Sequence, residues 1–185
     1  MEKSCRISVF IDASNLWEAM KANCKFVDFT KLVNYLRKHF DTDKIKVYYY
    51  TAYPAEGTRS YSTSPKHAFF TFLSRQLGFV MRKKPLKQIH VVDGDTDIIR
   101  EKGNMDVEIT IDAVNQIDNY DIAIFFSGDS DFLPLVSFIR RSGRKVYVFS
   151  SKDNVSKEMA TGSDGYIDIL KIQDDIWGKE ITRRE

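Results

Sequence analysis

The stretch FFSGDSDFLPLV, residues 125–136, joins a predicted buried strand to a predicted helix through a short polar turn. The strand, residues 120–128, is the most apolar strand candidate in the chain, which is typical of a strand covered on both faces. Beyond the turn the apolar residues recur at helical spacing, and Gly143 suits the position just past the helix end. The turn carries Asp129 and Asp131, which could cap the helix or bind a cation.

Strands and helices alternate along the rest of the chain. Strands are predicted at residues 5–12, 44–53, 79–84, 87–93, 120–128, 144–151 and 166–172. Helices are predicted after Ser14 and Asn15, which can cap the first one, and at residues 28–40, 65–78, 105–117, 131–143 and 154–163. The 105–117 segment is also rich in β-branched residues, which would permit a strand, and the polar segments 54–64 and 94–105 are predicted loops. This alternation predicts an α/β fold with a parallel sheet covered on both faces.

Length and composition are those of an ordinary globular protein. The chain has 185 residues, of which 43% are apolar and 29% charged, and its formal net charge is only +2. These values predict one domain, which we place at residues 1–175, followed by a loose tail at 176–185. Because the net charge is small, binding to nucleic acid would need a local basic patch. Basic residues gather at 81–87 and 140–145, where they either form a solvated face or follow phosphates.

The sequence predicts neither a targeting segment nor a membrane span nor a zinc site. No apolar run approaches the roughly 18 residues that cross a bilayer, and a strand is predicted close to the first residue. The two cysteines, Cys5 and Cys24, lack the spacing of metal ligands, and so do the three histidines. We therefore expect a reduced, cytoplasmic protein without membrane contact.

Acidic residues follow two of the predicted strands. Asp12 ends the first strand, and Asp129 and Asp131 follow the most apolar one. In parallel sheets ligands bind outside the carboxyl ends of the strands, so neighbouring strands would place these acids together. Two bare charges about 4 Å apart repel by roughly 4 kcal/mol at an effective dielectric of 20, and Mg²⁺ prefers carboxylate ligands. Helix capping is the alternative for each acid alone, but it does not explain the doubled acid.

The segment VVDGDTD, residues 91–97, is the densest acidic stretch, and its first residues resemble a calcium-binding loop. The position that requires glycine is Ile98, and the twelfth position is Asn104 in place of glutamate. We therefore predict a solvated hairpin or loop here.

Three motifs, VFIDASNLW, KGNMDVEITIDAV and FFSGDSDFLPLV, together resemble the NYN domain family of PIN-like nucleases, including its LabA-like members. They occur in the family's order and cover about residues 6–150. The resemblance implies a three-layer α/β/α sandwich of the PIN-like, Rossmannoid kind, with an acidic Mg²⁺ or Mn²⁺ site and activity on RNA. Ala13 replaces the usual glycine of the first motif, and the middle motif has one residue more before its acid.

The resemblance also assigns roles to particular side chains. Four residues correspond to the metal-binding and catalytic acids of the family: Asp12, Asp106, Asp129 and Asp131. Asp112, on the same segment, is the alternative to Asp106, but it could instead be a buried, hydrogen-bonded acid, and Asp106 is preferred. Five residues are candidates for contact with substrate: Asn15, Trp17, Lys102, Ser127 and Ser130. Of these, Trp17 could stack on a base or belong to the core, and Lys102 could contact phosphate or cap a loop.

We therefore expect a metal-dependent endoribonuclease that hydrolyses phosphodiester bonds of single-stranded RNA. One alternative is a regulatory, RNA-binding PIN-like module with little turnover. A second is a phosphohydrolase for small phosphate compounds, since a carboxylate-bound metal serves either chemistry. The sequence does not decide whether the chain pairs with a second copy or with a protein partner.

Overall fold

The centre of the protein is a six-stranded sheet in which every neighbouring pair of strands is parallel. The computed structural model describes residues 5–54, 64–93, 96–172 and 174–181. The strand order is β4 (Val80–Pro85), β3 (Ile45–Tyr53), β1 (Ile7–Asp12), β7 (Ile122–Phe126), β8 (Lys145–Ser150) and β9 (Gly165–Asp168). The predicted α/β class with a mainly parallel sheet is therefore confirmed.

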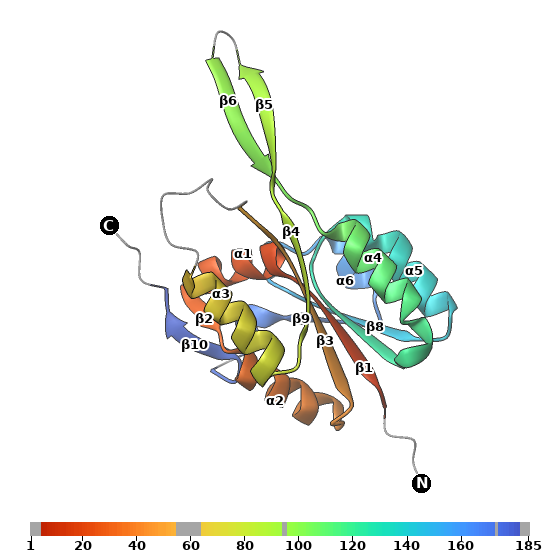
Figure 1. Ribbon diagram of the computed structural model, residues 1–185. Coiled ribbons are helices and arrows are strands. Elements are labelled where there is room, and N and C mark those ends of the chain that lie inside the picture. Colours follow the sequence, from red (N-terminus) through yellow and green to blue (C-terminus); the bar gives the residue numbers. More distant parts are fainter. Residues whose placement is uncertain (1–4, 55–63, 94–95, 173, 182–185) are drawn as a thin grey trace.

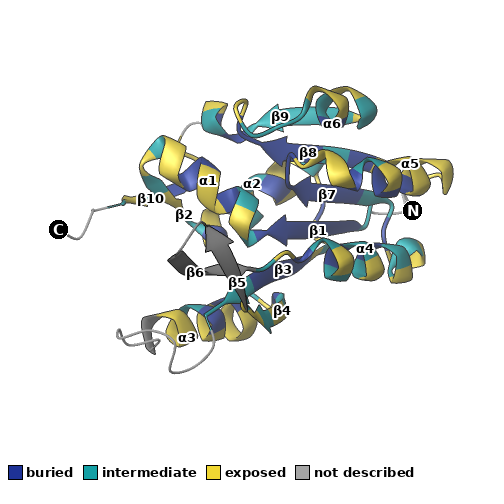
Figure 2. Ribbon diagram, turned by 90° about the horizontal axis from the view of Figure 1, so that it is seen from above, coloured by how far each residue is buried: buried dark blue, intermediate teal, exposed yellow. Residues whose placement is uncertain are grey.

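Helices cover both faces of this sheet (Figures 1 and 2). On one face lie α1 (Ala13–Asn23), α2 (Phe29–Phe40) and α3 (Ser64–Thr71), the last of which continues into a π-helical turn, Phe72–Gln76. On the other face lie α4 (Asp106–Asn115), α5 (Leu133–Arg141) and α6 (Lys157–Gly162). The predicted helices are all present, and the 105–117 segment is helical, with a 3₁₀ turn at Ile117–Asn119.

Alternating side chains of the central strands divide the core into two layers. In β1, Val9 and Ile11 pack on the side of α1 and α2, whereas Phe10 packs on the side of α4 and α5. Successive side chains of a strand point to opposite faces, which explains this division. Phe10 stacks on Tyr48 and Phe125 of the two neighbouring strands, with ring centroids 5.3 and 5.1 Å apart. This aromatic row ties β3, β1 and β7 together beneath α4 and α5.

Two antiparallel strand pairs lie beside the main sheet. β2 (Lys25–Val27) pairs with β10 (Trp177–Glu180), and Trp177 is only 3% exposed. The predicted loose tail is therefore wrong for these residues, because the indole packs in the core and its Nε1 donates to the Ile172 carbonyl at 2.9 Å. Residues 182–185 of the expected tail lie outside the described residues.

The second pair is a hairpin formed by β5 (Lys87–Asp93) and β6 (Thr96–Lys102), which projects away from the body of the protein (Figure 1). The loop predicted at residues 94–105 is thus a strand over most of its length, because cross-strand pairing with β5 orders a segment whose own composition is that of a loop. The loop predicted at 54–64 falls mostly on residues 55–63, outside the described part of the chain.

Other elements begin or end differently from the prediction. The first helix is capped by Asp12, not by Ser14 or Asn15, since the Asp12 side chain accepts a hydrogen bond from the Ser14 amide. The last strand of the sheet is shorter than predicted, because Asp168 caps a 3₁₀ turn at Ile169–Lys171. Among the described residues, no helix combines the length and the apolar character required to cross a membrane.

An ion pair fastens the amino-terminal ends of β1 and β7 to each other. The Asp121 carboxylate accepts hydrogen bonds from the Arg6 amide at 2.9 Å and from the Arg6 guanidinium at 3.2 and 3.0 Å. These bonds from Arg6, assisted by the nearby charge of Arg144, lower the pKa of Asp121 to about 2. Because this pKa is depressed in the folded protein, the stabilisation is present above about pH 4 and is lost as the pH falls toward 2.

We expect Asp121→Asn to destabilise the protein by about 1 kcal/mol at pH 7, because a charge-assisted pair is lost at a partly exposed site. The deficit relative to the wild type should shrink between pH 4 and 2, where the wild-type carboxylate itself becomes protonated. Urea unfolding at several pH values measures this. Asp43→Asn is the control, since the Asp43 side chain is 97% exposed and pairs with Arg37 at 3.7 Å. A deficit independent of pH would contradict the assignment.

Candidate metal and active site

The carboxyl edge of the sheet collects the acidic residues. β1 and β7 are neighbours in register, with Ile11 opposite Phe126, so Asp12 at the end of β1 lies beside the turn that follows β7. α4 starts at this edge too, with Asp106 as its first residue. The three motifs, far apart in the sequence, therefore meet at one place because parallel strands end on the same side.

Asp106, Asp129 and Asp131 form an acidic trio in which one carboxylate oxygen from each residue lies within 4.8 Å of the others. Asp129 caps the 3₁₀ turn Ser130–Phe132 by accepting the Asp131 amide at 2.9 Å. Asp106 is held by Asn104, whose side-chain amide donates to the Asp106 carboxylate and whose Oδ1 accepts the Asp106 backbone amide at 2.8 Å. Local capping bonds thus fix the orientation of two of the three carboxylates.

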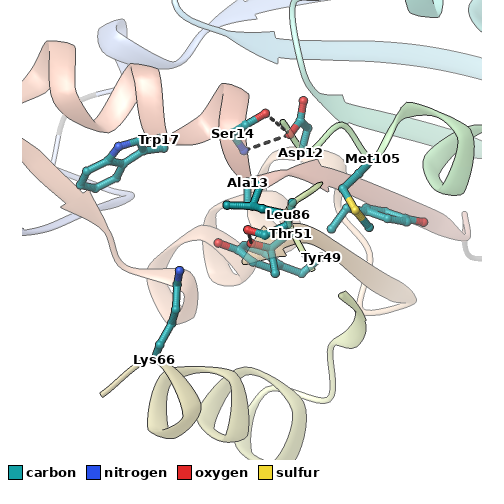
Figure 3. Close-up of a pocket in the computed structure, with 12 residues that line it drawn as sticks. Asp12, Ala13, Ser14, Trp17, Tyr49, Thr51, Lys66, Leu86 and Met105 are labelled. Carbon is teal, nitrogen blue, oxygen red and sulfur yellow. Dashed lines mark hydrogen bonds between the residues drawn. The ribbon is translucent and has the colours of Figure 1, made fainter. Parts of the chain in front are cut away.

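Asp12 lies next to this trio and is largely buried, with 9% of its surface exposed. Its Oδ1 accepts hydrogen bonds from the Ser14 amide at 2.9 Å and from the Ser14 hydroxyl at 2.7 Å (Figure 3). Burial raises the pKa of Asp12 and outweighs these bonds, and the negative charge of Asp129 raises the pKa further. Asp12 therefore serves both as a helix cap and as a fourth acid of the site.

The basic side chains that the structure describes do not neutralise the charges of this cluster. Burial and the charges of Asp12, Asp129 and Asp131 raise the pKa of Asp106, while the bond from Asn104 opposes this rise. None of the four acids forms an ion pair with any other described residue. Carboxylate oxygens held this close are suitable ligands for a hard divalent cation such as Mg²⁺, which would remove the repulsion.

Asp112, the alternative to Asp106, lies outside the cluster. Its carboxylate pairs with the Arg82 guanidinium at 2.7 Å and accepts the Tyr50 hydroxyl at 2.9 Å. Burial alone would raise the pKa of Asp112, but these two partners outweigh it and lower the pKa. Six residues along an α-helix correspond to about 9 Å and more than one and a half turns, so the two acids cannot share one site. The structure therefore brings Asp106, and not Asp112, to the other acids.

The predicted polar neighbours mostly brace the turn after β7. Asn15 Oδ1 accepts the Gly128 amide and the Ser150 hydroxyl, both at 3.2 Å, and so connects α1 to the ends of β7 and β8. Ser127 is buried and its hydroxyl accepts the Asp129 amide at 3.4 Å. Ser130 is exposed beside the trio. The side chain of Lys102 lies outside the described part of the structure.

Gly128 allows the turn after β7 to approach the loop after β8. The sequence did not predict this packing requirement. A Cβ atom at this position would lie 2.4 Å from the Asn154 carbonyl oxygen and 2.5 Å from the Val155 Cα. The Gly128 carbonyl in turn accepts the Ser156 amide at 2.9 Å. Backbone atoms cannot yield easily to such a contact, so glycine is needed here for packing.

A cavity of about 440 Å³ adjoins Asp12 on the side away from β7 (Figure 3). Its walls come from α1, from the ends of β3 and β4, from the segment before α4 and from the start of α3. The lining residues are Asp12, Ala13, Ser14, Trp17, Tyr49, Tyr50, Thr51, Ala52, Lys66, Leu86, Gly103 and Met105. Of this set, only Asp12 and Trp17 are predicted site residues. Ala13, Ser14, Gly103 and Met105 belong to the quoted motifs but carry no predicted role in the site, and the remaining residues come from segments without a recognisable motif.

Comparison with known proteins identifies the family of this chain. A family model of the NYN domain matches residues 6–170, and the chain therefore belongs to the NYN domain family. It is 28% identical over 168 residues to the low amplitude and bright protein LabA of Synechococcus elongatus, covering 91% of this chain and 86% of that protein. It also resembles the crystal structure of a protein of unknown function from Vibrio parahaemolyticus, with a TM-score of 0.69 and 24% identity over 96% of this chain and 99% of that one.

The family relationship confirms the predicted class, that of a nuclease-like NYN domain. The likeness to the Vibrio parahaemolyticus structure supports the fold alone. In this chain, any nuclease chemistry would depend on the acidic trio at the carboxyl edge of the sheet.

We expect Mn²⁺ or Mg²⁺ to raise the thermal unfolding temperature of the wild type, because a bound cation would relieve the repulsion within the trio. Asp129→Asn should abolish this response. In EDTA the same variant should be more stable than the wild type by about 1 kcal/mol, since asparagine keeps the cap and removes one charge.

Thermal unfolding followed by circular dichroism, with and without metal, measures both effects. Asp112→Asn is the matched control, because Asp112 belongs to the same helix as Asp106 but pairs with Arg82. It should lower the unfolding temperature and leave the metal response unchanged. Equal responses of the Asp129→Asn and wild-type proteins to metal would contradict a cation site at the trio.

Proposed function

We propose that the protein is a metal-dependent ribonuclease that hydrolyses phosphodiester bonds of single-stranded RNA with Mg²⁺ or Mn²⁺. The observation that carries this proposal is the trio of Asp106, Asp129 and Asp131, with carboxylate oxygens within 4.8 Å of one another. A chain of the nuclease-like NYN family that gathers its acids in this way has the ligand set that such chemistry requires.

The carboxylates of the trio would hold the cation, and Asp12 would act through a water molecule. When bound, a divalent cation supplies an activated water and offsets the charge of the phosphate. The protein contributes the placement of the acids, through the Asp129 cap, the clamp from Asn104 and the buried position of Asp12. Ser130 is exposed beside the trio, where its hydroxyl would orient a phosphate oxygen or the attacking water.

The proposed substrate approaches from the open side of the trio, since both Asp129 and Asp131 are exposed. The basic runs predicted as phosphate contacts are largely engaged elsewhere. Arg82 pairs with Asp112 and Lys84 with Glu108, and Arg140 pairs with Asp164. Because these cations already have acidic partners, they contribute less to binding phosphate than their number suggests. Positioning by the metal site and by contacts close to it therefore carries more of the substrate recognition.

We expect purified protein to cut end-labelled single-stranded RNA in Mn²⁺ or Mg²⁺ but not in EDTA. Asp129→Asn should reduce the rate by about 100-fold or more, because stabilisation of the transition state by a metal is worth several kcal/mol. Asp112→Asn should keep most of the activity under conditions where it is folded. Gel analysis of the fragments measures the rate and shows whether the cuts are internal, as expected for an endoribonuclease.

The other outcomes identify the competing functions. Metal-dependent stabilisation and RNA binding without cleavage would indicate a regulatory RNA-binding module. Turnover of free nucleotides with indifference to RNA length would indicate a phosphohydrolase of small compounds. Cleavage that is equal in the wild type and in Asp129→Asn would refute the assigned site.

A further inference from the structure

The cavity beside Asp12 opens at the same edge of the sheet as the acidic trio. In the order β4-β3-β1-β7, Asp129 and Asp131 of the trio follow β7, Asp12 ends β1, and the cavity opens at the ends of β3 and β4. Asp12 therefore lies between the turn after β7 and the cavity, and Asp106 follows the segment that lines the cavity. A chain whose phosphate lies at the trio and whose backbone follows this edge would bring a neighbouring nucleotide to the cavity.

The lining of the cavity suits a flat and mainly apolar group. Ala13, Ala52, Leu86 and Met105 supply aliphatic surface, and Trp17 and Tyr49 supply aromatic surface. The volume of about 440 Å³ lies within the usual range for small-molecule sites. Gly103 is required for the shape, because a Cβ atom there would lie 2.4 Å from Leu86 Cδ2 and 2.5 Å from Ala52 Cβ. A nucleobase presents the planar surface that such a lining accepts.

Trp17 offers a stacking surface in this cavity. Its ring is tilted against Phe26, with centroids 6.1 Å apart, and the side chain remains 41% exposed. Phe26 thus supports the indole without covering it. Stacking on an aromatic side chain accepts every base, because each base has a π-face.

Lys66 supplies a positive charge at the same cavity. It belongs to the first turn of α3 and, as Figure 3 shows, its amino group points toward the space between Trp17 and Tyr49. Among the described residues it forms no ion pair, in contrast to Arg82, Lys84 and Arg140. An unpaired lysine beside an aromatic surface can contact the phosphate of the nucleotide whose base is stacked there.

We propose that this cavity is a nucleobase subsite, which receives the base of a nucleotide next to the phosphodiester bond at the trio. Trp17 provides the stacking surface, and Lys66 contacts the adjoining phosphate. The inference rests on the proposed ribonuclease function, because it places the substrate of that function across Asp12. The subsite adds two properties to that function. The protein would recognise an unpaired strand with an accessible base, and it would have only a weak preference among the four bases.

Base-dependent binding tests the subsite directly. Single-stranded RNAs of four nucleotides, and the same RNAs with one abasic nucleotide, are titrated into Asp129→Asn protein, so that cleavage does not interfere. The readout is tryptophan fluorescence. The chain has only two tryptophans, and Trp177 is only 3% exposed. A change in fluorescence that disappears in a Trp17→Phe variant therefore comes from Trp17. We expect quenching by intact RNA and about fivefold weaker binding when the abasic nucleotide occupies the subsite.

Substitution of Trp17 must remove that dependence on the base. In Trp17→Ala the affinity for intact RNA should fall about fivefold or more, and the abasic RNA should bind nearly as well as the intact one. Trp17→Phe should keep most of the affinity, because it retains a flat ring. Phe138→Ala is the matched control, since Phe138 is similarly exposed, at 39%, but lies on α5 across the sheet.

The charge of Lys66 is tested by the salt dependence of binding. Lys66→Ala should reduce the slope of log affinity against log salt concentration by about one, with a similar loss for intact and abasic RNA. Lys38→Ala, which removes an exposed lysine of α2 outside the cavity, should leave the slope unchanged.

The results separate this subsite from the proposed activity. Metal-dependent cleavage combined with equal binding of intact and abasic RNA would overturn the subsite and leave the ribonuclease standing. Base-dependent quenching of Trp17 without any cleavage by the wild type would support the subsite and refute the ribonuclease. Full affinity of Trp17→Ala for intact RNA, with the variant folded by circular dichroism, would also overturn the subsite.

Discussion

The parallel pairing of β1 with β7 is the constraint on which the rest of this structure depends. It brings Asp12 beside the turn after β7 and sets the edge at which α4 begins with Asp106. Three features enforce the pairing, namely the ion pair of Arg6 with Asp121, the stack of Phe10 on Phe125 and the hydrogen bonds of Asn15 across the strand ends. Each contributes little alone, but together they hold the acids to one geometry.

The acidic cluster makes the folded protein less stable in the absence of a cation. Repulsion and burial raise the pKa of both Asp12 and Asp106, which is unfavourable for folding without a cation. The same carboxylates also serve as local caps for α1 and for the turn after β7, and this offsets part of the cost. Capping does not exclude the proposed metal binding, because the caps of Asp12 and Asp129 use one carboxylate oxygen each.

The distribution of basic side chains also limits how substrate is recognised. Arg82 and Lys84 are neutralised by acids of α4, so the basic run of β4 mainly fastens that helix to the sheet. Lys66 remains without such a partner among the described residues and lies at the cavity that adjoins Asp12. With these ion pairs and a net charge of only +2, the proposed recognition of substrate would depend on contacts close to the acids more than on a broad positive surface.

The sequence alone determined the α/β alternation and the buried strands, and its motifs identified Asp12, Asp129 and Asp131 as candidate acids, because these features depend on local periodicity and on motif residues. It did not determine that Asp106 and not Asp112 joins the site, since that depends on the direction each side chain takes from α4 and on Arg82 of a distant strand. The packing role of Gly128, the pairing of β10 with β2 and the cavity lined by Lys66, Leu86 and Met105 were likewise decided only by tertiary structure. Each arises from contacts between segments far apart in the chain, which no local pattern encodes.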